Sequence, residues 1–322
     1  MIASLLLSVA VAAATPAPSL PTMPQLPQNC SKATAFTGTI CTPAGAGRHP
    51  AILLLGGSEG GDIMAYSAPR FAGAGYVAAS VAYFGLPGLP QSLEEIPVET
   101  VGKALAAIAS RSDVDAGHIA IFGGSKGGEL ALLAASVYPQ IHAVVADVPS
   151  PFAWQGIPRG PAAPKSSWTL HGQPLPYVPY TSRMGEIFGA AFSSGKPLDV
   201  RPGYDAAMEV NGAMIPAAMF HLENVHGPIM FVAADDDQVW DSVAQSHIGM
   251  KYLRDHHHAY ADQYLHYAGA GHLFLFSTPQ MPFTQVPMGG GVTMLLGGTA
   301  QANVQAAQDA WPRIMSFLSG AL

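Results

Sequence analysis

The sequence has few charged residues, and this shortage excludes two classes of protein. Only 11% of its 322 residues are Asp, Glu, Lys or Arg, while hydrophobic residues make up 49%. Disordered chains and nucleic-acid-binding domains have the opposite balance. The formal net charge of −7 also gives the surface no general attraction for a polyanion. We therefore expect a globular protein with no nucleic-acid partner.

Long apolar runs are absent beyond the N-terminus, so we expect no membrane span in the body of the chain. The first residues, "MIASLLLSVAVAAA", form a short apolar run that ends in small residues, with Ala12 and Ala14 in an A-x-A-like arrangement. This pattern is typical of a secretory signal peptide, and we interpret residues 1–14 as one. The mature protein would then be periplasmic or secreted. A buried N-terminal helix in a cytoplasmic protein, or a membrane anchor, is the alternative.

Cysteine is nearly absent, with only Cys30 and Cys41 in the chain. Both lie in the N-terminal segment 15–48, around a stretch that suits a short hairpin. In an oxidising compartment a disulfide between them is reasonable, and two free thiols are the alternative. The histidine run 256–258 lacks the cysteine or carboxylate spacing of a zinc site. We expect neither a metal nor a cofactor.

From residue 49 onward the pattern alternates between apolar strands and helices. The expected strands are 51–57, 76–85, 118–124, 142–148, 228–235 and 263–269, and the expected helices are 64–73, 94–110, 126–137, 241–255 and 301–319. Near-continuous apolar strands alternating with helices predict a mostly parallel sheet that helices cover on both faces. We therefore predict one α/β domain over residues 49–322. Pro312 lies inside the last helix, where we expect a kink or a restart.

Residues 150–226 break this rhythm with many prolines and aromatic residues. The stretch is too long for a plain loop, and we interpret it as an insertion that folds over the sheet as a lid. Its aromatic residues Trp154, Trp168 and Tyr180 are candidates for substrate binding. Residues 150–201 also contain five basic residues against two acidic ones. That excess suits either an anionic substrate or an ordinary solvated surface.

A glycine-flanked serine connects one predicted strand to the next helix, in "IAIFGGSKGGELALLAAS". Residues 123–127 fit the pattern G-x-S-x-G, which in this context predicts a nucleophile elbow with Ser125 at its tip. A glycine-rich turn with an idle serine is the alternative. A phosphate-binding Walker loop is disfavoured, because Gly127 stands where that loop needs Ser or Thr after Lys126.

A serine nucleophile needs a base and an acid, which follow it in the order Ser, acid, His in the α/β-hydrolase fold. The segment "PIMFVAADDDQVW" supplies Asp235, Asp236 and Asp237 after a late strand, and spacing alone does not choose among them. After the last strand, "YAGAGHL" places His272 behind a Gly-Ala-Gly turn, where the base is expected.

The reaction also needs backbone N–H donors for the developing negative charge. The amide of Lys126, directly after the nucleophile, is the first candidate. The loop in "LLLGGSEGGD" offers the second, and among Gly56, Gly57, Ser58 and Glu59 we favour Gly57 and Ser58. A merely flexible turn is the alternative for this loop.

Together, "LLLGGSEGG", "YFGLPGLPQSLEEIPVE", "FGGSKGGELAL", "ADDDQVWDS", "YAGAGHL" and "DAWPRIMSFL" resemble one family. It is the C-terminal catalytic domain of acyl-CoA thioester hydrolases and bile acid-CoA:amino acid N-acyltransferases. The most specific match is "SKGGEL". The resemblance implies an α/β-hydrolase fold and an acyl-enzyme mechanism with Ser125 as nucleophile. Aligned on Trp240, it also implies that Asp237 is the acid, with Asp236 next in rank.

We therefore expect a serine hydrolase that cleaves small-molecule acyl thioesters or esters through Ser125, His272 and Asp237. An acyltransferase that passes the acyl group to an amine is one alternative. A catalytically silent binding protein with the same fold is the other. The oligomeric state is not indicated.

Overall fold

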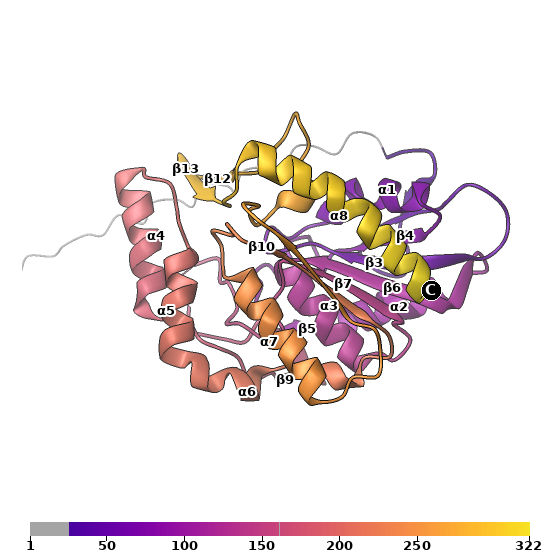
Figure 1. The fold of residues 1–322 in the computed structure, drawn as a ribbon, viewed down its shortest axis with the longest axis horizontal. Helices are drawn as coiled ribbons and strands as arrows, with labels where there is room; N and C mark the ends of the chain where they lie inside the picture. The colour runs from indigo at the N-terminus through magenta and orange to yellow at the C-terminus, as the bar shows by residue number, and fades with distance from the viewer. Residues whose placement is uncertain (1–25, 161) are drawn as a thin grey trace, which may run out of the picture.

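The computed structural model describes residues 26–160 and 162–322, and an eight-stranded sheet forms its centre (Figure 1). The strands lie in the order β1 (Cys30–Lys32), β2 (Gly38–Cys41), β4 (Val77–Val81), β3 (His49–Leu55), β6 (Val114–Gly124), β7 (Ala143–Asp147), β10 (Ile229–Ala234) and β11 (Gln263–Tyr267). All neighbours from β4 to β11 are parallel, whereas β1 and β2 are antiparallel. The expected mostly parallel sheet is confirmed. The proposed signal peptide, residues 1–14, lies outside the described residues.

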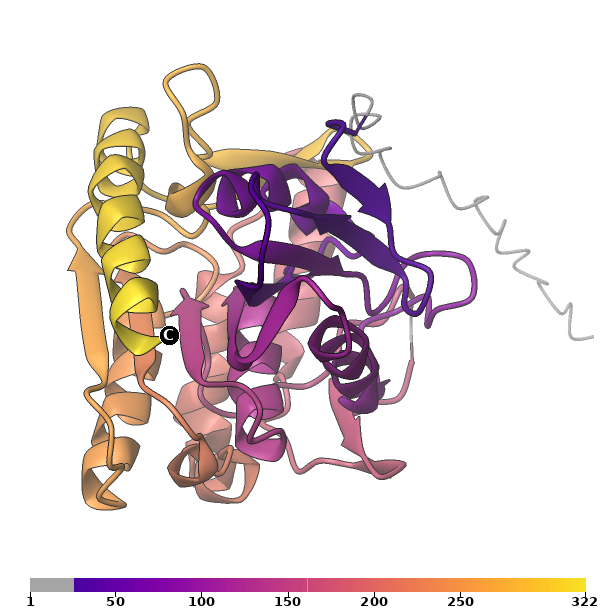
Figure 2. The same cartoon turned by 90° about the vertical axis from the view of Figure 1, so that its right-hand side faces the viewer.

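Helices cover both faces of this sheet, as expected. Helices α1 (Ala68–Gly73) and α8 (Ala300–Ala321) pack on one face, and α2 (Glu99–Ala109), α3 (Lys126–Val137) and α7 (Ser242–Asp255) pack on the other (Figures 1 and 2). Every residue of β4, β7 and β10 is buried, because helices cover both faces. This burial explains why these strands read as unbroken apolar runs.

Two expected helix starts and the expected break at Pro312 differ in the structure. The helix predicted at 64–73 is a 3₁₀ turn, η1 (Ile63–Tyr66), followed by the short α1. The helix predicted to start at 94 begins only at Glu99, after the strand β5 (Ile96–Pro97). Helix α8 runs through Pro312 without restarting. Pro312 and Gln308 are both exposed, so solvent can satisfy the carbonyl group of Gln308 that proline leaves without a partner.

The insertion at residues 150–226 contains its own small elements, which extend to one side of the sheet (Figure 1). They are β8 (Trp168–Leu170), β9 (Gln173–Pro174), α4 (Ser182–Ser194), α5 (Arg201–Asn211), η2 (Gly212–Met214), α6 (Ile215–Ala218) and η3 (Leu222–Asn224). Strand β8 pairs with β5 and β9 in a three-stranded sheet. After the main sheet follow η4 (Phe274–Phe276) and the hairpin β12 (Gln285–Gly289) and β13 (Val292–Leu295). In the part of the chain that is described, no helix is long and apolar enough to cross a membrane.

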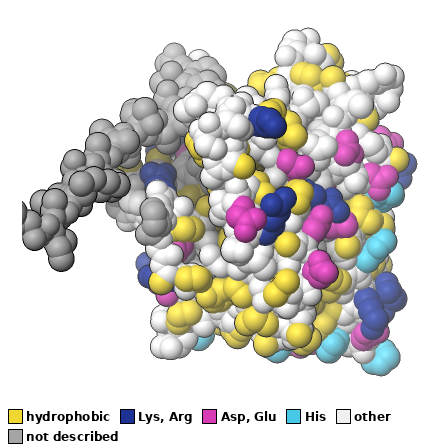
Figure 3. All heavy atoms as spheres, turned by 90° about the vertical axis from the view of Figure 1, so that its left-hand side faces the viewer, with side chains coloured by type: hydrophobic (Ala, Val, Ile, Leu, Met, Phe, Trp, Pro, Cys, Tyr) yellow, Lys and Arg dark blue, Asp and Glu magenta, His cyan; other side chains and the backbone are white. Residues whose placement is uncertain are grey.

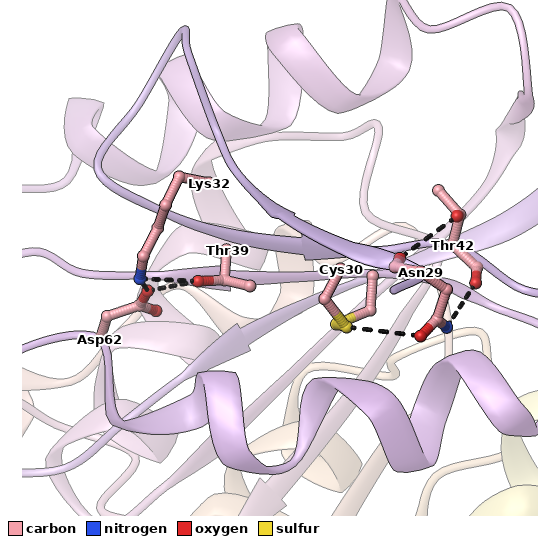
Figure 4. The surroundings of a disulfide bond; sticks show 7 residues. Asn29, Cys30, Lys32, Thr39, Thr42 and Asp62 are labelled. Atoms are coloured by element: carbon pink, nitrogen blue, oxygen red, sulfur yellow. Dashed lines mark hydrogen bonds and ion pairs between the residues drawn. A yellow bond between two sulfur atoms is a disulfide. The ribbon is translucent and has the colours of Figure 1, made fainter. Parts of the chain in front are cut away.

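A disulfide between Cys30 and Cys41 joins the first two strands at the edge of the sheet (Figure 4). The same edge is held by Asp62, whose carboxylate accepts hydrogen bonds from Lys32 at 2.7 Å and Thr39 at 2.6 Å. The disulfide therefore closes the N-terminal segment on itself, and the pairing of β2 with β4 together with the Asp62 contacts fastens this segment to the domain.

Candidate active site

Ser125 occupies a strained turn between β6 and α3. Its backbone has φ 55° and ψ −124°, a left-handed conformation that a side-chain-bearing residue rarely adopts. The turn is also very tight, because a Cβ atom on Gly123 would lie only 2.0 Å from the carbonyl oxygen of Gly127. Glycine at these positions lets the strand and the helix approach each other, and the turn holds the serine hydroxyl at the carboxyl edge of the sheet.

The structure brings Ser125, His272 and Asp237 into one hydrogen-bonded chain. The Oγ atom of Ser125 lies 2.7 Å from Nε2 of His272, and Nδ1 of His272 lies 2.9 Å from each carboxylate oxygen of Asp237. With a hydrogen on Nδ1 donated to Asp237, Nε2 is free to accept the serine hydroxyl. This is the arrangement in which a serine becomes a nucleophile.

The three consecutive aspartates have three different partners. Asp235 contacts His266 at 2.6 Å, and Asp236 accepts the amide of Gly298 at 3.0 Å. Only Asp237 of the three faces His272, and its carboxylate also accepts the backbone amides that follow it, Val239 at 2.9 Å and Trp240 at 3.2 Å. The structure therefore distinguishes residues that spacing alone did not.

The candidate oxyanion donors lie on both sides of the nucleophile. Lys126 directly follows Ser125 at the first position of α3. Gly57 lies beside the serine, because a Cβ atom on it would be 3.3 Å from Cβ of Ser125. Its amide already donates to Oε1 of Glu59 at 3.0 Å, a contact that sequence reasoning missed. Ser58 is exposed on the same loop.

A buried polar network that sequence reasoning missed lies behind the nucleophile. Nζ of Lys126 donates to Oε2 of Glu129 at 2.6 Å and to Oγ of Ser167 at 2.8 Å. The other oxygen of Glu129 accepts the indole N–H of Trp168 at 2.6 Å and the backbone amide of Trp154 at 3.1 Å. Burial lowers the pKa of Lys126 and raises that of Glu129, and the ion pair opposes both shifts. The network fastens the insertion to α3.

Aromatic rings connect the insertion with His272. Ring centroids lie 4.9 Å apart for Trp154 and Tyr204, 5.4 Å for Tyr204 and Trp240, and 5.5 Å for Trp240 and His272. The hydroxyl of Tyr180 lies 3.1 Å from that of Tyr204. Both Trp154 and Trp168 are fully buried, so in the structure they are packing residues, and their contact with a substrate stays a prediction together with that of Tyr180.

Arg201, at the start of α5, links the insertion to the loop that carries Asp237. Its guanidinium donates to the carbonyl oxygen of Asp237 at 2.7 Å and to the carboxylate of Asp241 at 2.8 Å. Through Arg201 and the Lys126 network, the insertion contacts both the acid loop and the nucleophile turn.

Three of the five basic residues in 150–201 form ion pairs with acidic residues. Lys165 pairs with Glu95, Arg183 with Glu186, and Arg201 with Asp205 and Asp241. On the face that Figure 3 shows, Lys and Arg side chains lie next to Asp and Glu side chains. This pairing favours the solvated-surface interpretation for these three residues.

A second buried carboxyl group lies close to the triad. Asp147, at the end of β7, is fully buried, and among the described residues neither of its carboxyl oxygens has a hydrogen-bond partner. Burial raises its pKa well above the usual range, and the negative charge of Asp237 adds to the shift. Both effects favour the protonated form of Asp147 in the folded protein.

The triad itself is almost closed to solvent, with Ser125 exposed by 7% and His272 by 4%. Within residues 26–160 and 162–322, no three His, Cys, Asp or Glu side chains gather in a way that would hold a metal ion.

Comparison with known proteins places the chain in a family. Residues 96–322 match the family described as BAAT / Acyl-CoA thioester hydrolase C terminal. The chain belongs to this family. A peroxisomal succinyl-coenzyme A thioesterase from Mus musculus is 28% identical over 282 residues, covering 87% of this chain and 62% of the relative. An acyl-coenzyme A amino acid N-acyltransferase 1 from Mus musculus is 26% identical over 280 residues, with the same two coverages.

This BAAT / acyl-CoA thioester hydrolase domain spans about three fifths of the length of these curated relatives. Among solved structures, a hyperthermophilic esterase from the archaeon Pyrobaculum calidifontis superimposes with a TM-score of 0.52 at 16% identity, covering 88% of this chain and 80% of the esterase. That similarity concerns the fold alone, and it confirms the expected α/β-hydrolase architecture. The relatives in this family include both thioesterases and N-acyltransferases.

Proposed function

We propose that the protein is a serine hydrolase that cleaves acyl thioesters or esters through an acyl-enzyme. The observation that carries the proposal is the unbroken hydrogen-bonded chain from Ser125 through His272 to Asp237. The strained backbone of Ser125 supports it, since such strain collects at functional turns.

In the proposed reaction, Oγ of Ser125 attacks the carbonyl carbon while Nε2 of His272 takes the hydroxyl proton. Asp237 keeps the imidazole oriented and stabilises its charged form. The amide of Lys126, with an amide of the Gly57–Ser58 loop, stabilises the oxyanion. The leaving thiol or alcohol takes the proton from His272. Water, activated by the same nitrogen, then releases the acid and regenerates Ser125.

The acyl-CoA thioesterases among the relatives favour a thioester as substrate. The N-acyltransferases among them support a second candidate, in which an amine replaces water in the last step. The two differ only in which nucleophile reaches the acyl-enzyme. Product analysis in the presence of an amino acid separates them, because only the transferase yields an amide.

The first experiment compares the purified protein with its Ser125→Ala variant on p-nitrophenyl esters and acyl-CoAs of increasing chain length. We expect product release by the wild type alone. The preferred acyl chain length then indicates the size of the site that holds the acyl group. Equal background rates for both proteins on every substrate, together with no labelling by a fluorophosphonate, would favour the binding-protein alternative.

We also propose export of the protein, on the basis of the signal-like residues 1–14 and the disulfide between Cys30 and Cys41. N-terminal sequencing of protein recovered from the periplasm or the medium tests this. A mature N-terminus near residue 15 supports export, and an intact Met1 on protein found only in the cytoplasm contradicts it.

A further inference from the structure

In the loop after β3, a carboxyl group accepts the hydrogen of an amide that the proposed reaction needs as a free donor. Oε1 of Glu59 accepts the amide hydrogen of Gly57, with the two heavy atoms 3.0 Å apart. The other oxygen, Oε2, lies 2.9 Å from the position that a Cβ atom on Gly57 would occupy, and Cβ of Ser125 is 3.3 Å from that same position. The Glu59 carboxyl group and Ser125 are therefore both neighbours of Gly57.

The oxygen of a substrate carbonyl has to reach this region in the proposed function, on which this inference rests. When Oγ of Ser125 bonds to the carbonyl carbon, the new oxyanion needs N–H donors about 3 Å away. The amide of Gly57 provides one such donor, but it has a single hydrogen, and Glu59 already accepts it. A carboxylate oxygen and an oxyanion cannot both occupy the place in front of that hydrogen.

We propose that Glu59 occupies the oxyanion hole of the resting protein, and that a substrate's carbonyl oxygen must displace this carboxylate before acylation. Glu59 is thus an internal competitor of the substrate. Its Oε1 atom accepts the hydrogen that the oxygen of the tetrahedral intermediate would accept.

The amide of Gly57 does not depend on Glu59 for its position. The buried hydroxyl of Tyr83 lies 2.6 Å from the carbonyl oxygen of Gly56 and 3.1 Å from that of Gly57, and it holds this turn from the other side. Removing the carboxylate therefore frees the amide and leaves its anchor in place.

The carboxylate is also able to leave. Glu59 as a residue is exposed, and it precedes Gly60 and Gly61, which have φ of 71° and 74°. Only its carboxyl end is buried, so rotation about the side-chain bonds can carry that end from its place beside Gly57 toward the solvent that the rest of the residue already contacts. The titratable groups facing its carboxyl end are His272 and the phenol of Tyr83. Burial raises the pKa of Glu59, and His272 acts in the opposite direction.

The test measures how fast a fluorophosphonate labels Ser125, since its phosphoryl oxygen enters the same hole. We compare the wild type with Glu59→Ala, Glu59→Gln and the control Asp255→Ala, which removes an exposed carboxylate at the end of α7. Because hydrogen bonds to charged groups are the stronger ones, we expect the second-order rate constant of Glu59→Ala to rise about tenfold or more. Glu59→Gln should rise less, since its neutral oxygen keeps a weaker bond, and Asp255→Ala should match the wild type.

A labelling rate of Glu59→Ala equal to or below that of the wild type, with an unchanged melting temperature, overturns the proposal. If that variant melts early, the Glu59→Gln rate decides, and no increase there overturns it as well. Failure of the wild type to label at all, with Ser125→Ala as the blank, is a different result. It overturns the proposed serine hydrolase function and this inference with it.

Discussion

Lys126 and Glu129 form an ion pair with 2.6 Å between Nζ and Oε2, and both side chains are closed to solvent directly behind the nucleophile. Charges so deeply buried are costly unless every donor and acceptor has a partner. Here Ser167, Trp154 and Trp168 supply those partners from the insertion. The pair therefore explains why a lysine and a glutamate stand in the motif "SKGGEL".

Breaking this pair should destabilise the protein strongly. We expect Lys126→Met to lower the free energy of unfolding by about 3–5 kcal/mol, because it leaves the Glu129 carboxylate buried without its counter-charge. Glu129→Gln keeps an oxygen for Trp168 and leaves Lys126 unpaired. In the double variant neither charge remains, so its loss should be smaller than the sum of the single losses by about 1 kcal/mol or more. Urea unfolding of the four proteins measures this, and additive losses would contradict it.

The acid of the triad should be separable from its neighbour by a matched pair of substitutions. Asp237→Asn keeps the shape of the side chain but removes the charge that orients His272, and we expect kcat to fall about 10⁴-fold. Asp236→Asn alters only a carboxylate that accepts the Gly298 amide, and we expect a change below about tenfold. Ester hydrolysis by both variants checks this. Equal losses would mean that the two carboxylates share the role.

The raised pKa of the buried Asp147 carboxyl group should make stability depend on pH. Its folded-state pKa is raised, so the folded protein holds a proton that the unfolded chain releases above about pH 4. Its contribution to the unfolding free energy is therefore full at low pH and decreases by about 1.4 kcal/mol per pH unit as the pH rises toward the folded-state pKa. Asp147→Asn should remove this slope. Urea unfolding of both proteins between pH 5 and pH 8 measures the difference, and parallel curves would contradict the prediction.

The disulfide between Cys30 and Cys41 should contribute stability rather than activity. It closes a loop with a sequence separation of 11, for which chain entropy gives about 3 kcal/mol. We expect Cys30→Ala/Cys41→Ala to melt at a lower temperature and to hydrolyse esters at the wild-type rate. Dithiothreitol should lower the melting temperature of the wild type and leave the double variant unchanged. A wild type insensitive to the reductant would contradict the prediction.

Much of the domain could be predicted from local sequence. The fully buried strands appear as apolar runs because helices cover both faces of the sheet, and α3 spans the predicted residues 126–137. The turn at Ser125 was also recognisable from glycines that are needed there because neighbouring backbone atoms leave no room for a side chain. These features depend on residues that are neighbours in the chain.

The remaining features depend on contacts between distant residues. Lys126 donates to Ser167, which lies 41 residues further along the chain, and no sequence pattern in the proline-rich insertion predicts that contact. Glu59 is itself exposed, and the neighbouring sequence does not predict that its carboxyl group points toward the Gly57 amide. Helix α8 likewise continues through Pro312 because Gln308 and Pro312 lie on the solvent-facing side of the helix, which the sequence around the proline does not reveal.

The insertion is fastened at two points, through Lys126 to the nucleophile turn and through Arg201 to the acid loop. Helix α4 lies between these anchors in the chain and is exposed along most of its length. Substitutions in α4 can therefore accumulate without moving Ser125, His272 or Asp237. Sequence change in this outer helix is therefore compatible with constancy at the three residues that form the hydrogen-bonded chain.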